Sequence, residues 1–245
     1  MALWCVVAAA GAGSRMGSSG PKQYLNIMGK TVFEWTMHQL LQLTECAGWV
    51  VAVAADDRKA ATLLTADAPC LWVHGGDSRA ESVLAALEML WERETPADDW
   101  VLVHDIARPC VCVSDIRHLL AVCRADPLQQ GGLLAAPVVD TLKKADSQGR
   151  VGHTADRAGL WSALTPQLFP LAVLRQALHA AKQQGLEVRD EASAMEALGY
   201  RPLLVAGRRD NIKITYPEDL QMAEDIIRRN YVDADSGRSE SGGCA

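Results

Sequence analysis

Residues 3–24, LWCVVAAAGAGSRMGSSGPKQY, decide the fold class of this 245-residue chain. The uninterrupted apolar run over residues 3–9 is typical of a strand that is buried on both faces of a parallel sheet. The loop that follows is rich in glycine and carries two cations, Arg15 and Lys22, before a helical pattern begins. Glycines let the backbone approach a bound molecule closely. This order of elements therefore indicates a ligand-binding turn at the carboxyl end of a strand.

Three more apolar runs, over residues 49–54, 70–74 and 100–105, alternate with helical patterns. Alternating strands and helices predict right-handed βαβ units and an α/β fold with a single doubly wound, mostly parallel sheet. Such sheets bind ligands at the carboxyl ends of their strands. We therefore expect the loops after residues 9, 74 and 105 to gather around one site.

Helix starts are marked by two capping-box spacings, Thr31 with Glu34 and Ser78 with Glu81. The second helix continues with an apolar stripe formed by Val83, Leu84, Leu87, Leu90 and Trp91. This spacing predicts a helix that buries the whole stripe, Trp91 included, in the core.

The pattern changes in residues 138–160, which alternate weakly, carry several charges and have no helical stripe. We expect a β-arm that leaves the main sheet there. Helices are then expected over residues 170–184 and 190–198, strands over 203–206 and 211–215, and a last helix from Pro217 to about 229. Residues 1–230 are thus expected to form one domain that includes the arm. Residues 231–245 are polar and rich in Ser and Gly, which predicts a disordered tail.

Composition excludes several classes of protein. The net charge is −6 without a basic stripe, which argues against nucleic-acid binding. The apolar runs are shorter than the ~18 residues of a membrane span. The seven cysteines are scattered without a C-x-x-C pair, which argues against a zinc site or a disulfide framework and favours a reducing, cytoplasmic compartment. The first 33 residues contain no Asp or Glu, so this segment suits an anion.

Three kinds of phosphate-binding loop compete for the first turn. Met16 breaks the G-x-G-x-x-G fingerprint of a dinucleotide site, and no Gly-Lys-Ser/Thr completes a P-loop. What remains is a glycine turn with Arg15 and Lys22, which suits a triphosphate because cations neutralise charge that develops during transfer. Asp105 ends a buried strand; it fits a metal ligand, a helix cap or an ion pair with Arg108.

Eight motifs in one order carry a resemblance to a known family. They are G-x-G-S-R-M…P-K-Q-Y in the first loop, G-G-D-S-R-x-E-S-V (75–83), V-H-D-x-A-R-P (103–109), D-T-L-K (140–143), A-D-R-x-G-L-W (155–161), L-T-P-Q (164–167), D-E-A-S-A-M-E (190–196) and D-N-I-K-I-T (210–215). Over about residues 3–228 the chain resembles the 2-C-methyl-D-erythritol 4-phosphate cytidylyltransferases of the non-mevalonate isoprenoid pathway. The resemblance implies a Rossmann-like nucleotidyltransferase fold. It also implies a metal-dependent enzyme that joins CTP and methylerythritol phosphate to give CDP-methylerythritol and pyrophosphate.

The resemblance also implies a role for each matching residue. Arg15 and Lys22 match the catalytic cations, and Asp105 matches the residue beside the Mg²⁺-bound phosphates. CTP-binding positions are Ala9, Ala10, Gly11, Gly13, Gly76, Asp77, Ser82 and Lys213; acceptor-side positions are Arg108, Thr141, Arg157 and Arg189. Members of the family are homodimers that exchange their arms, so Thr141 and Arg157 are expected to complete the partner's acceptor site.

Three positions depart from the family pattern: Ala8 replaces a proline, Ile106 a small residue, and Arg189 an expected threonine. Ile106 is expected to narrow the acceptor pocket, and Arg189 either binds phosphate or points outward. His104 and His153 are expected to be structural, because the acceptor phosphate is already anionic. Alternative functions are a cytidylyltransferase for ribitol 5-phosphate or another polyol phosphate, a non-catalytic nucleotide-binding regulator, and a dinucleotide-dependent oxidoreductase.

Overall fold

The central sheet carries the site and has seven strands in the part of the chain that the structure describes. This computed structural model describes residues 1–11, 20–65 and 68–232. The strands are β1 (Leu3–Ala8), β4 (Cys46–Val53), β5 (Cys70–His74), β6 (Trp100–Asp105), β7 (Gly132–Pro137), β10 (Trp161–Pro170) and β11 (Leu203–Ala206). Their order is β11-β7-β10-β6-β1-β4-β5. Strand β10 is antiparallel to both of its neighbours, and every other pair in this order is parallel. The predicted mostly parallel sheet is confirmed, as are the strands expected near residues 3–9, 49–54, 70–74, 100–105 and 203–206.

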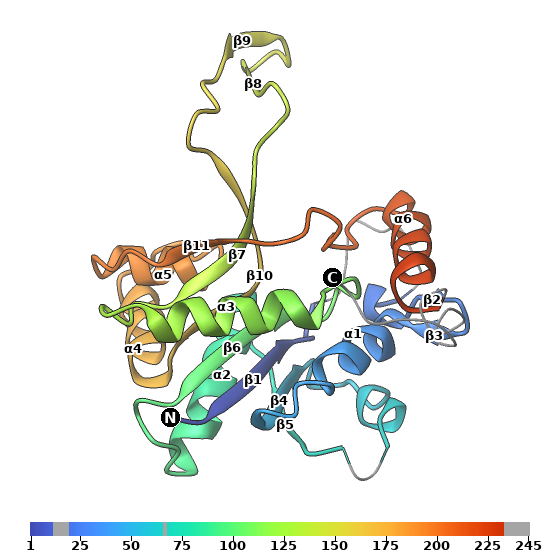
Figure 1. Ribbon diagram of the computed structural model, residues 1–245, viewed down its shortest axis with the longest axis vertical. Coiled ribbons are helices and arrows are strands. Elements are labelled where there is room, and N and C mark those ends of the chain that lie inside the picture. Colours follow the sequence, from blue (N-terminus) through green and yellow to red (C-terminus); the bar gives the residue numbers. More distant parts are fainter. Residues whose placement is uncertain (12–19, 66–67, 233–245) are drawn as a thin grey trace.

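Side chains from both faces of this sheet are buried, which explains the uninterrupted apolar runs. Cys5 and Val7 of β1 belong to one core, whereas Val6 between them belongs to another. The first core also receives α1 (Val32–Leu40) and α3 (Val113–Ala125). The second receives α2 (Arg79–Glu92), α4 (Leu171–Gln183) and α5 (Glu191–Ala197). The helices therefore cover the sheet on both faces, as Figure 1 shows, and the fold is doubly wound.

Both predicted capping boxes are present and fix the starts of α1 and α2. The side chains of Thr31 and Ser78 accept hydrogen bonds from the backbone amides three residues later. The expectation for Trp91 was wrong, because this side chain is 40% exposed. It lies one position beyond the buried stripe, and the guanidinium of Arg175 on α4 covers its ring at 4.6 Å. The long cation of a neighbouring helix thus shields an aromatic ring that the core does not reach.

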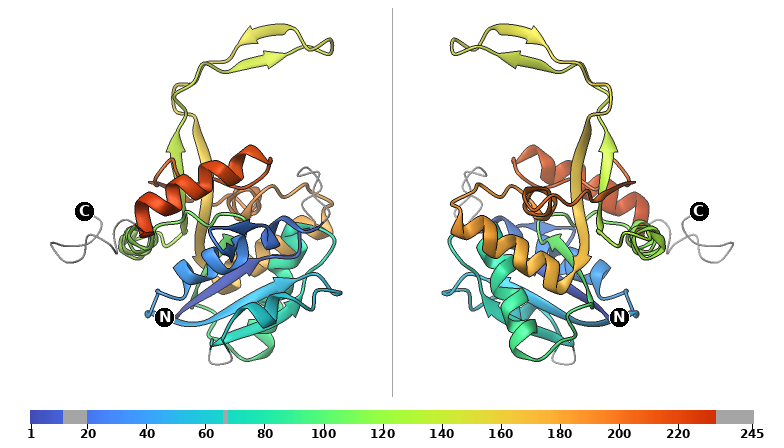
Figure 2. Two further views of the ribbon diagram at one scale, coloured as in Figure 1. Left: turned by 90° about the vertical axis from the view of Figure 1, so that its right-hand side faces the viewer. Right: turned by 90° about the vertical axis from the view of Figure 1, so that its left-hand side faces the viewer.

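The expected arm projects far from the sheet. It ends in a two-stranded hairpin of β8 (Lys143–Ala145) and β9 (Val151–Thr154), on a stalk that continues β7 and β10. Figures 1 and 2 show this hairpin standing clear of the rest of the molecule in all three views. Its strands are exposed along their whole length.

Shorter elements complete the chain around the carboxyl ends of the strands. They are η2 (Lys22–Tyr24), β2 (Asn26–Ile27), β3 (Lys30–Thr31), η3 (Ala60–Leu63), α6 (Glu218–Ile227) and the π-helical turn η4 (Arg228–Val232). Pro217 directly precedes α6, as predicted. No helix within the described ranges is both long and apolar enough to cross a membrane.

Residues 211–215, which we call the crossing segment, are not the expected strand. They belong to the connection from β11 to α6, which runs across the molecule in Figure 1. Ile212 and Ile214 alternate with polar residues in the sequence, but burial does not alternate: Asn211 and Ile214 are buried, whereas Ile212 and Lys213 are half-buried. Ile214 donates its amide hydrogen to the carbonyl oxygen of Ala107, in a loop rather than in a strand. The segment is therefore partly buried without belonging to a sheet ladder.

Candidate active site

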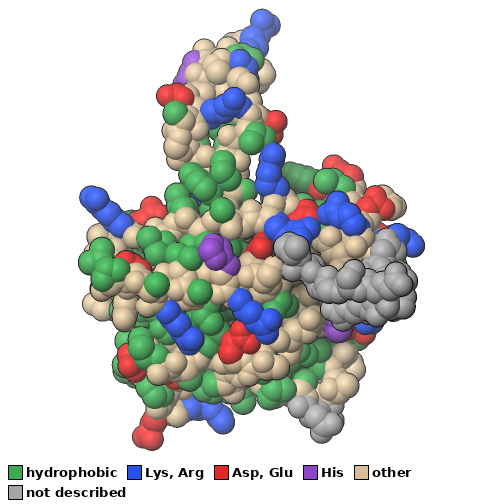
Figure 3. Space-filling model, in the orientation of Figure 1, with side chains coloured by type: hydrophobic (Ala, Val, Ile, Leu, Met, Phe, Trp, Pro, Cys, Tyr) green, Lys and Arg blue, Asp and Glu red, His purple; other side chains and the backbone are tan. Residues whose placement is uncertain are grey.

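A cleft of about 390 Å³ lies at the carboxyl ends of β1, β5 and β6. The loops after these three strands meet there, as predicted, and η2 and the crossing segment supply further walls. The residues of the sequence prediction that line it are Ala10, Gly11, Lys22, Gly76, Asp77, Ser82, Asp105 and Lys213. In Figure 3, Lys and Arg side chains with Asp and Glu between them lie on the face between the foot of the arm and α6. The fold thus brings together residues from positions 10 to 213.

The first loop contributes Lys22 to the described part of the cleft. Its ammonium group donates a hydrogen bond to the carbonyl oxygen of Ile214 at 2.6 Å. Gln23 beside it donates to the carbonyl oxygen of Ala9 at 3.0 Å, and so ties η2 to the end of β1. Ala9 itself is buried and supports the cleft from behind. Arg15, Gly13 and Met16 lie outside the described residues.

Asp105 ends β6 and lies between three cations. Its Oδ1 accepts from Nε of Arg79 at 2.6 Å, and its Oδ2 accepts from Nζ of Lys213 at 2.7 Å. Nε of Arg108 is farther away, at 3.8 Å. Burial alone would raise the pKa of Asp105, but the charges of Arg79 and Lys213 hold this pKa far below its usual range. Arg79 and Lys213 are therefore its main partners, rather than the Arg108 considered from the sequence.

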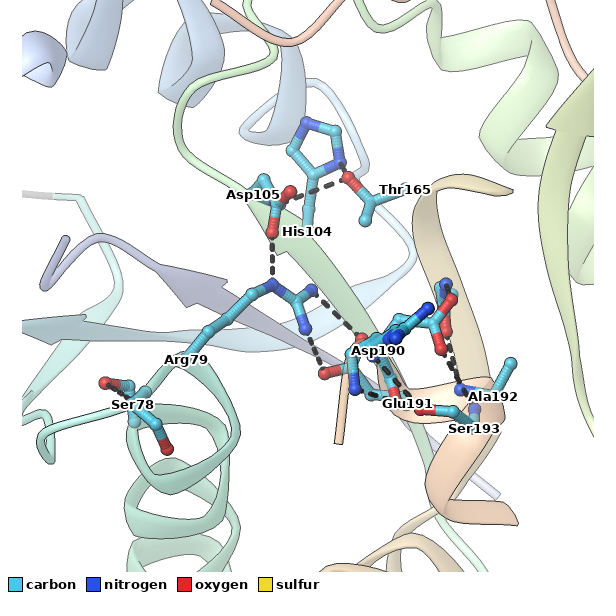
Figure 4. A network of polar contacts seen from close by, with 12 residues as sticks. Ser78, Arg79, His104, Asp105, Thr165, Asp190, Glu191, Ala192 and Ser193 are labelled. Carbon is cyan, nitrogen blue, oxygen red and sulfur yellow. Dashed lines mark hydrogen bonds and ion pairs between the residues drawn. The ribbon is translucent and has the colours of Figure 1, made fainter. Parts of the chain in front are cut away.

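Arg79 and Glu191 were not assigned a role from the sequence, although both stand in the quoted motifs. Arg79 is the first residue of α2, and Glu191 is the first residue of α5. Nη1 and Nη2 of Arg79 donate to the two carboxylate oxygens of Glu191, at 2.6 and 3.0 Å. Figure 4 shows Arg79 between Asp105 and Glu191, with a contact to each. The available signal was the arginine in the G-G-D-S-R motif, because arginine commonly pairs with a carboxylate through two hydrogen bonds. The sequence did not indicate which carboxylate, because Glu191 lies 112 residues away.

His104 supports Asp105 from behind the cleft. Its Nε2 lies 3.2 Å from the carbonyl oxygen of Arg108, and its Nδ1 lies 2.9 Å from Oγ1 of Thr165. Because a carbonyl oxygen only accepts, Nε2 carries the hydrogen and Nδ1 accepts from the threonine hydroxyl. That hydroxyl accepts in turn from the amide of Asp105. Burial lowers the pKa of His104 to about 4, so the ring is neutral and structural, as expected.

Arg108 is buried and turned towards the crossing segment. Its Nη1 donates to the carbonyl oxygen of Asn211 at 2.7 Å, while the side-chain amide of Asn211 donates to the carbonyl oxygen of Thr165. Arg108 is absent from the residues found to line the cleft in the described part of the chain. Arg108 therefore anchors the segment that carries Lys213.

The loop after β5 approaches the first loop so closely that it requires glycine. A Cβ atom on Gly75 would lie 2.5 Å from Oγ of Ser82 and 2.6 Å from Cβ of Ala10. Ser82 is buried, and its hydroxyl donates to the carbonyl oxygen of Ser78 at 2.9 Å. This contact leaves Gly76 and Asp77 on the wall of the cleft. Such a backbone-lined wall suits a base that is selected through its polar edge.

The acceptor-side residues of the sequence prediction are scattered. Thr141 and Arg157 are exposed on the arm, and neither belongs to the described residues that line the cleft. The Arg189 side chain is 83% exposed and faces Glu187 at 3.9 Å, so it points outward. Ile106, by contrast, is buried and does line the cleft. The structure therefore brings together the nucleotide side of the predicted site and leaves the arm residues apart.

The cleft suits a divalent cation that arrives with other ligands. No group of three or more His, Cys, Asp or Glu side chains suited to a metal occurs among the residues that are described. Mg²⁺ commonly uses one or two carboxylates together with substrate phosphates and water. Among the described residues, each oxygen of Asp105 accepts one hydrogen bond, which leaves it a second lone pair. Asp105 therefore fits a cation whose remaining ligands are phosphate oxygens.

A doubly wound sheet whose cleft is lined by Gly11, the strand-end Asp105 and two anchored lysines is typical of a nucleotidyltransferase. Residues 3–229 match the family 2-C-methyl-D-erythritol 4-phosphate cytidylyltransferase. The chain belongs to this family, and it is an enzyme of the nucleotidyltransferase class.

Named relatives agree over nearly the whole chain. A 2-C-methyl-D-erythritol 4-phosphate cytidylyltransferase of Vibrio cholerae is 50% identical over 229 residues, which are 93% of this chain and 97% of the relative. One of Haemophilus influenzae is 48% identical over 225 residues, 92% of this chain and 96% of the relative. The crystal structure of the Francisella tularensis protein of that name has a TM-score of 0.80 at 33% identity. It covers 92% of this chain and 100% of the other.

Proposed function

We propose that this cleft joins CTP to 2-C-methyl-D-erythritol 4-phosphate and releases pyrophosphate. An oxygen of the acceptor phosphate attacks the α-phosphorus of CTP, and the bond from that phosphorus to the bridging oxygen of the β-phosphate breaks. The product is CDP-methylerythritol, a precursor in isoprenoid synthesis. The observation that carries the proposal is the pair of anchored lysines, Lys22 on Ile214 and Lys213 on Asp105, in one cleft.

The chemistry requires positioned positive charge rather than a nucleophile or a base. A phosphate monoester is already an anion near neutral pH, and phosphoryl-type transfers are driven by positioning and electrostatics. Lys22 and Lys213 neutralise charge that develops on the phosphates, and Arg15 of the first loop is proposed to do the same. His104 is neutral and points into the protein interior, so it takes no proton in this reaction.

Mg²⁺ is proposed as the cofactor, held by Asp105 and by the phosphates of CTP. It would supply further charge neutralisation at the triphosphate. Gly76, Asp77, Ser82 and the backbone of Ala10 and Gly11 are proposed to hold the cytidine. Their shared place on one wall supports this assignment.

The acceptor site is proposed to be shared between two subunits that exchange their arms. Two observations support this arrangement. Thr141 and Arg157 lie on the arm, which projects from the rest of the molecule (Figure 2), and neither belongs to the described residues that line the cleft. The arm and its foot also expose Val139, Val151, Leu160 and Trp161, by 46%, 66%, 42% and 37%. Exposed apolar side chains that lie together on one part of a surface commonly mark an interface with a partner.

Two alternative functions are not favoured. Relatives at 48–50% identity are named methylerythritol phosphate cytidylyltransferases, which argues against ribitol 5-phosphate as the acceptor. A non-catalytic regulator would not need Lys22, Asp105 and Lys213 in one cleft.

The six described cysteines are free, which supports the proposed cytoplasmic location.

A steady-state assay tests the proposal. Pyrophosphate release from CTP is measured with methylerythritol phosphate, with ribitol 5-phosphate and with no acceptor. We expect release with methylerythritol phosphate and a kcat/KM at least ~10²-fold lower with ribitol 5-phosphate, because a polar site rejects an acceptor that leaves its groups unpaired. Equal rates with both acceptors would refute the acceptor assignment, and no release with either would refute the reaction.

A further inference from the structure

Glu191 is a buried carboxylate that the proposed reaction does not use, and it contacts Arg79 in the lining of the cleft. Its side chain is completely buried, and both of its oxygens accept hydrogen bonds from Arg79. A buried carboxylate is costly unless it is paired and hydrogen-bonded. The N-terminus of α5 does not explain it, since Asp190, not Glu191, caps that helix through the amide of Ser193.

We propose that Glu191 is a positioning residue that acts on the cleft through Arg79, Asp105 and Lys213. This inference rests on the proposed function. The guanidinium of Arg79 gives Nη1 and Nη2 to Glu191 and Nε to Asp105. Three donors on one rigid plane are thereby fixed, so the side chain cannot turn without breaking contacts on both sides. The orientation of the Asp105 carboxylate is fixed with it.

Lys213 is the group that this arrangement places. It stands on the crossing segment, which belongs to neither a helix nor a strand. A lysine side chain has four rotatable carbons and is held in one position only by a partner. That partner is Oδ2 of Asp105, at 2.7 Å, while Oδ1 of the same carboxylate is held by Arg79. Charge that is preorganised in this way needs no rearrangement during the reaction.

Glu191, Arg79, Asp105 and Lys213 thus form a chain of contacts that we call the relay. It runs from the start of α5, through the first turn of α2 and the end of β6, to the crossing segment. Figure 4 shows its first three members, with Arg79 reaching across from α2 to both carboxylates. A purely structural role of Glu191 predicts a different result in mutants. Loss of Glu191 would then lower folding stability, and it would lower activity equally with and without Lys213.

The first variant is Glu191→Gln, which keeps the side-chain volume but removes the charge and one of the two acceptors. We expect kcat/KM for pyrophosphate release to fall about 10²-fold, the size typical of a misplaced group in an active site. The matched control is Glu187→Gln. Its side chain is 83% exposed on the preceding loop and lies outside the relay, so its kcat/KM should equal that of the wild type. Unchanged kcat/KM in folded Glu191→Gln overturns the proposal.

A double-mutant cycle with Lys213→Ala separates positioning from structure. If Glu191 acts through Lys213, Glu191→Gln should cost less than about threefold once Lys213 is absent, since coupled residues are not additive. A second loss of about 10²-fold in that background would show independent action and overturn the proposal. Circular dichroism and thermal unfolding are recorded for each variant.

Arg79→Lys is the second variant. It leaves Glu191 in place, so it tests the relay even if Glu191→Gln fails to fold. Lysine keeps the charge but cannot hold two carboxylates with three donors. The same loss of kcat/KM is expected, and it should again vanish beside Lys213→Ala; full activity of Arg79→Lys overturns the proposal.

The affinity for CTP is measured in parallel by calorimetry, because it does not depend on the acceptor. We expect Glu191→Gln and Arg79→Lys to weaken CTP binding when Lys213 is present and to have little effect beside Lys213→Ala. If the wild type binds CTP but releases pyrophosphate with neither methylerythritol phosphate nor ribitol 5-phosphate, the proposed function is wrong. The double-mutant cycle on CTP affinity still tests the relay in that case.

Discussion

The ammonium group of Lys22 donates a 2.6 Å hydrogen bond to the carbonyl oxygen of Ile214, 192 residues further along the chain. Ile214 is fully buried, and its own amide donates to Ala107 at 2.9 Å, so the acceptor is rigidly placed. The next residue towards the N-terminus is Lys213, which is held by Asp105. Two neighbouring residues of the crossing segment therefore place both lysines that are described in the cleft: Ile214 holds the ammonium group of Lys22, and Lys213 reaches from the segment to Asp105.

Removing the Lys22 ammonium should disable the reaction. We expect Lys22→Ala to reduce turnover by about 10²–10³-fold, as for a cation that faces charge in the transition state. Lys30→Ala is the matched control. Lys30 lies eight positions away and packs over the ring of Trp35 at 4.8 Å, outside the residues found to line the cleft. Near-wild-type turnover of Lys22→Ala, with Lys30→Ala also active, would remove Lys22 from the mechanism.

Removal of divalent cations should abolish pyrophosphate release, and Mg²⁺ should restore it. Asp105→Asn is expected to raise the Mg²⁺ concentration required for half-maximal activity, because an amide is a weaker ligand for a hard cation. Asp77→Asn is the comparison, since Asp77 is a second carboxylate on the cleft wall. Activity is titrated with Mg²⁺ for all three proteins. An unchanged Mg²⁺ requirement in Asp105→Asn would exclude Asp105 as a ligand, and a shift in Asp77→Asn alone would move the assignment there.

The buried His104 should make folding stability depend on pH in a defined window. Its folded pKa of about 4 lies below the ordinary value of 6.5. Between pH 6.5 and 4, His104 is therefore protonated in the unfolded chain but neutral in the folded protein. The stability that is present above pH 6.5 is lost as the pH falls towards 4. The difference in pKa corresponds to up to ~3 kcal/mol in the free energy of unfolding.

Urea unfolding between about pH 7.5 and 4.5 measures this effect. In His104→Gln the fall in unfolding free energy over this window should be smaller by the contribution of His104. His153→Gln is the control, because His153 is exposed on β9 and should leave the curve unchanged. A His104→Gln curve parallel to that of the wild type would show that the ring does not resist protonation.

The strands and the capping boxes could be predicted because their signals are local. Apolar runs such as residues 100–105 and the Thr31–Glu34 spacing depend on neighbours within a few residues. Trp91 was predicted wrongly because a helical stripe gives the direction of a side chain but not the depth of the core at that level. The crossing segment was predicted wrongly because apolar and polar residues can alternate along a loop as they do along a strand.

The site was predictable only in part. Motif resemblance pointed to Lys22, Asp105 and Lys213, but nothing local indicated which cation would hold Asp105. The choice of Arg79 over Arg108 depends on the contact between α2 and the end of β6, which is a tertiary property. The Arg79–Glu191 pair likewise joins the starts of two helices 112 residues apart.

Exchange of arms between subunits predicts a specific pattern of complementation. Lys22→Ala damages the nucleotide side of a cleft, whereas Arg157→Ala damages what the arm supplies. In a heterodimer of these two inactive variants, exchanged arms leave one cleft doubly damaged and the other intact. Mixing should then recover up to about half of the wild-type activity per dimer, as expected for independent symmetric sites.

The control for this experiment is a mixture of Lys22→Ala with Lys213→Ala, since both residues line the cleft of their own chain. That mixture should recover nothing, because each cleft of its heterodimer keeps one defect. Subunit exchange is verified with a tagged wild-type chain before activity is compared. Recovery in the first mixture alone shows that Arg157 reaches the partner's cleft. No recovery in either mixture, with exchange verified, means that Arg157 serves its own chain or no site at all, and the shared acceptor site is then wrong.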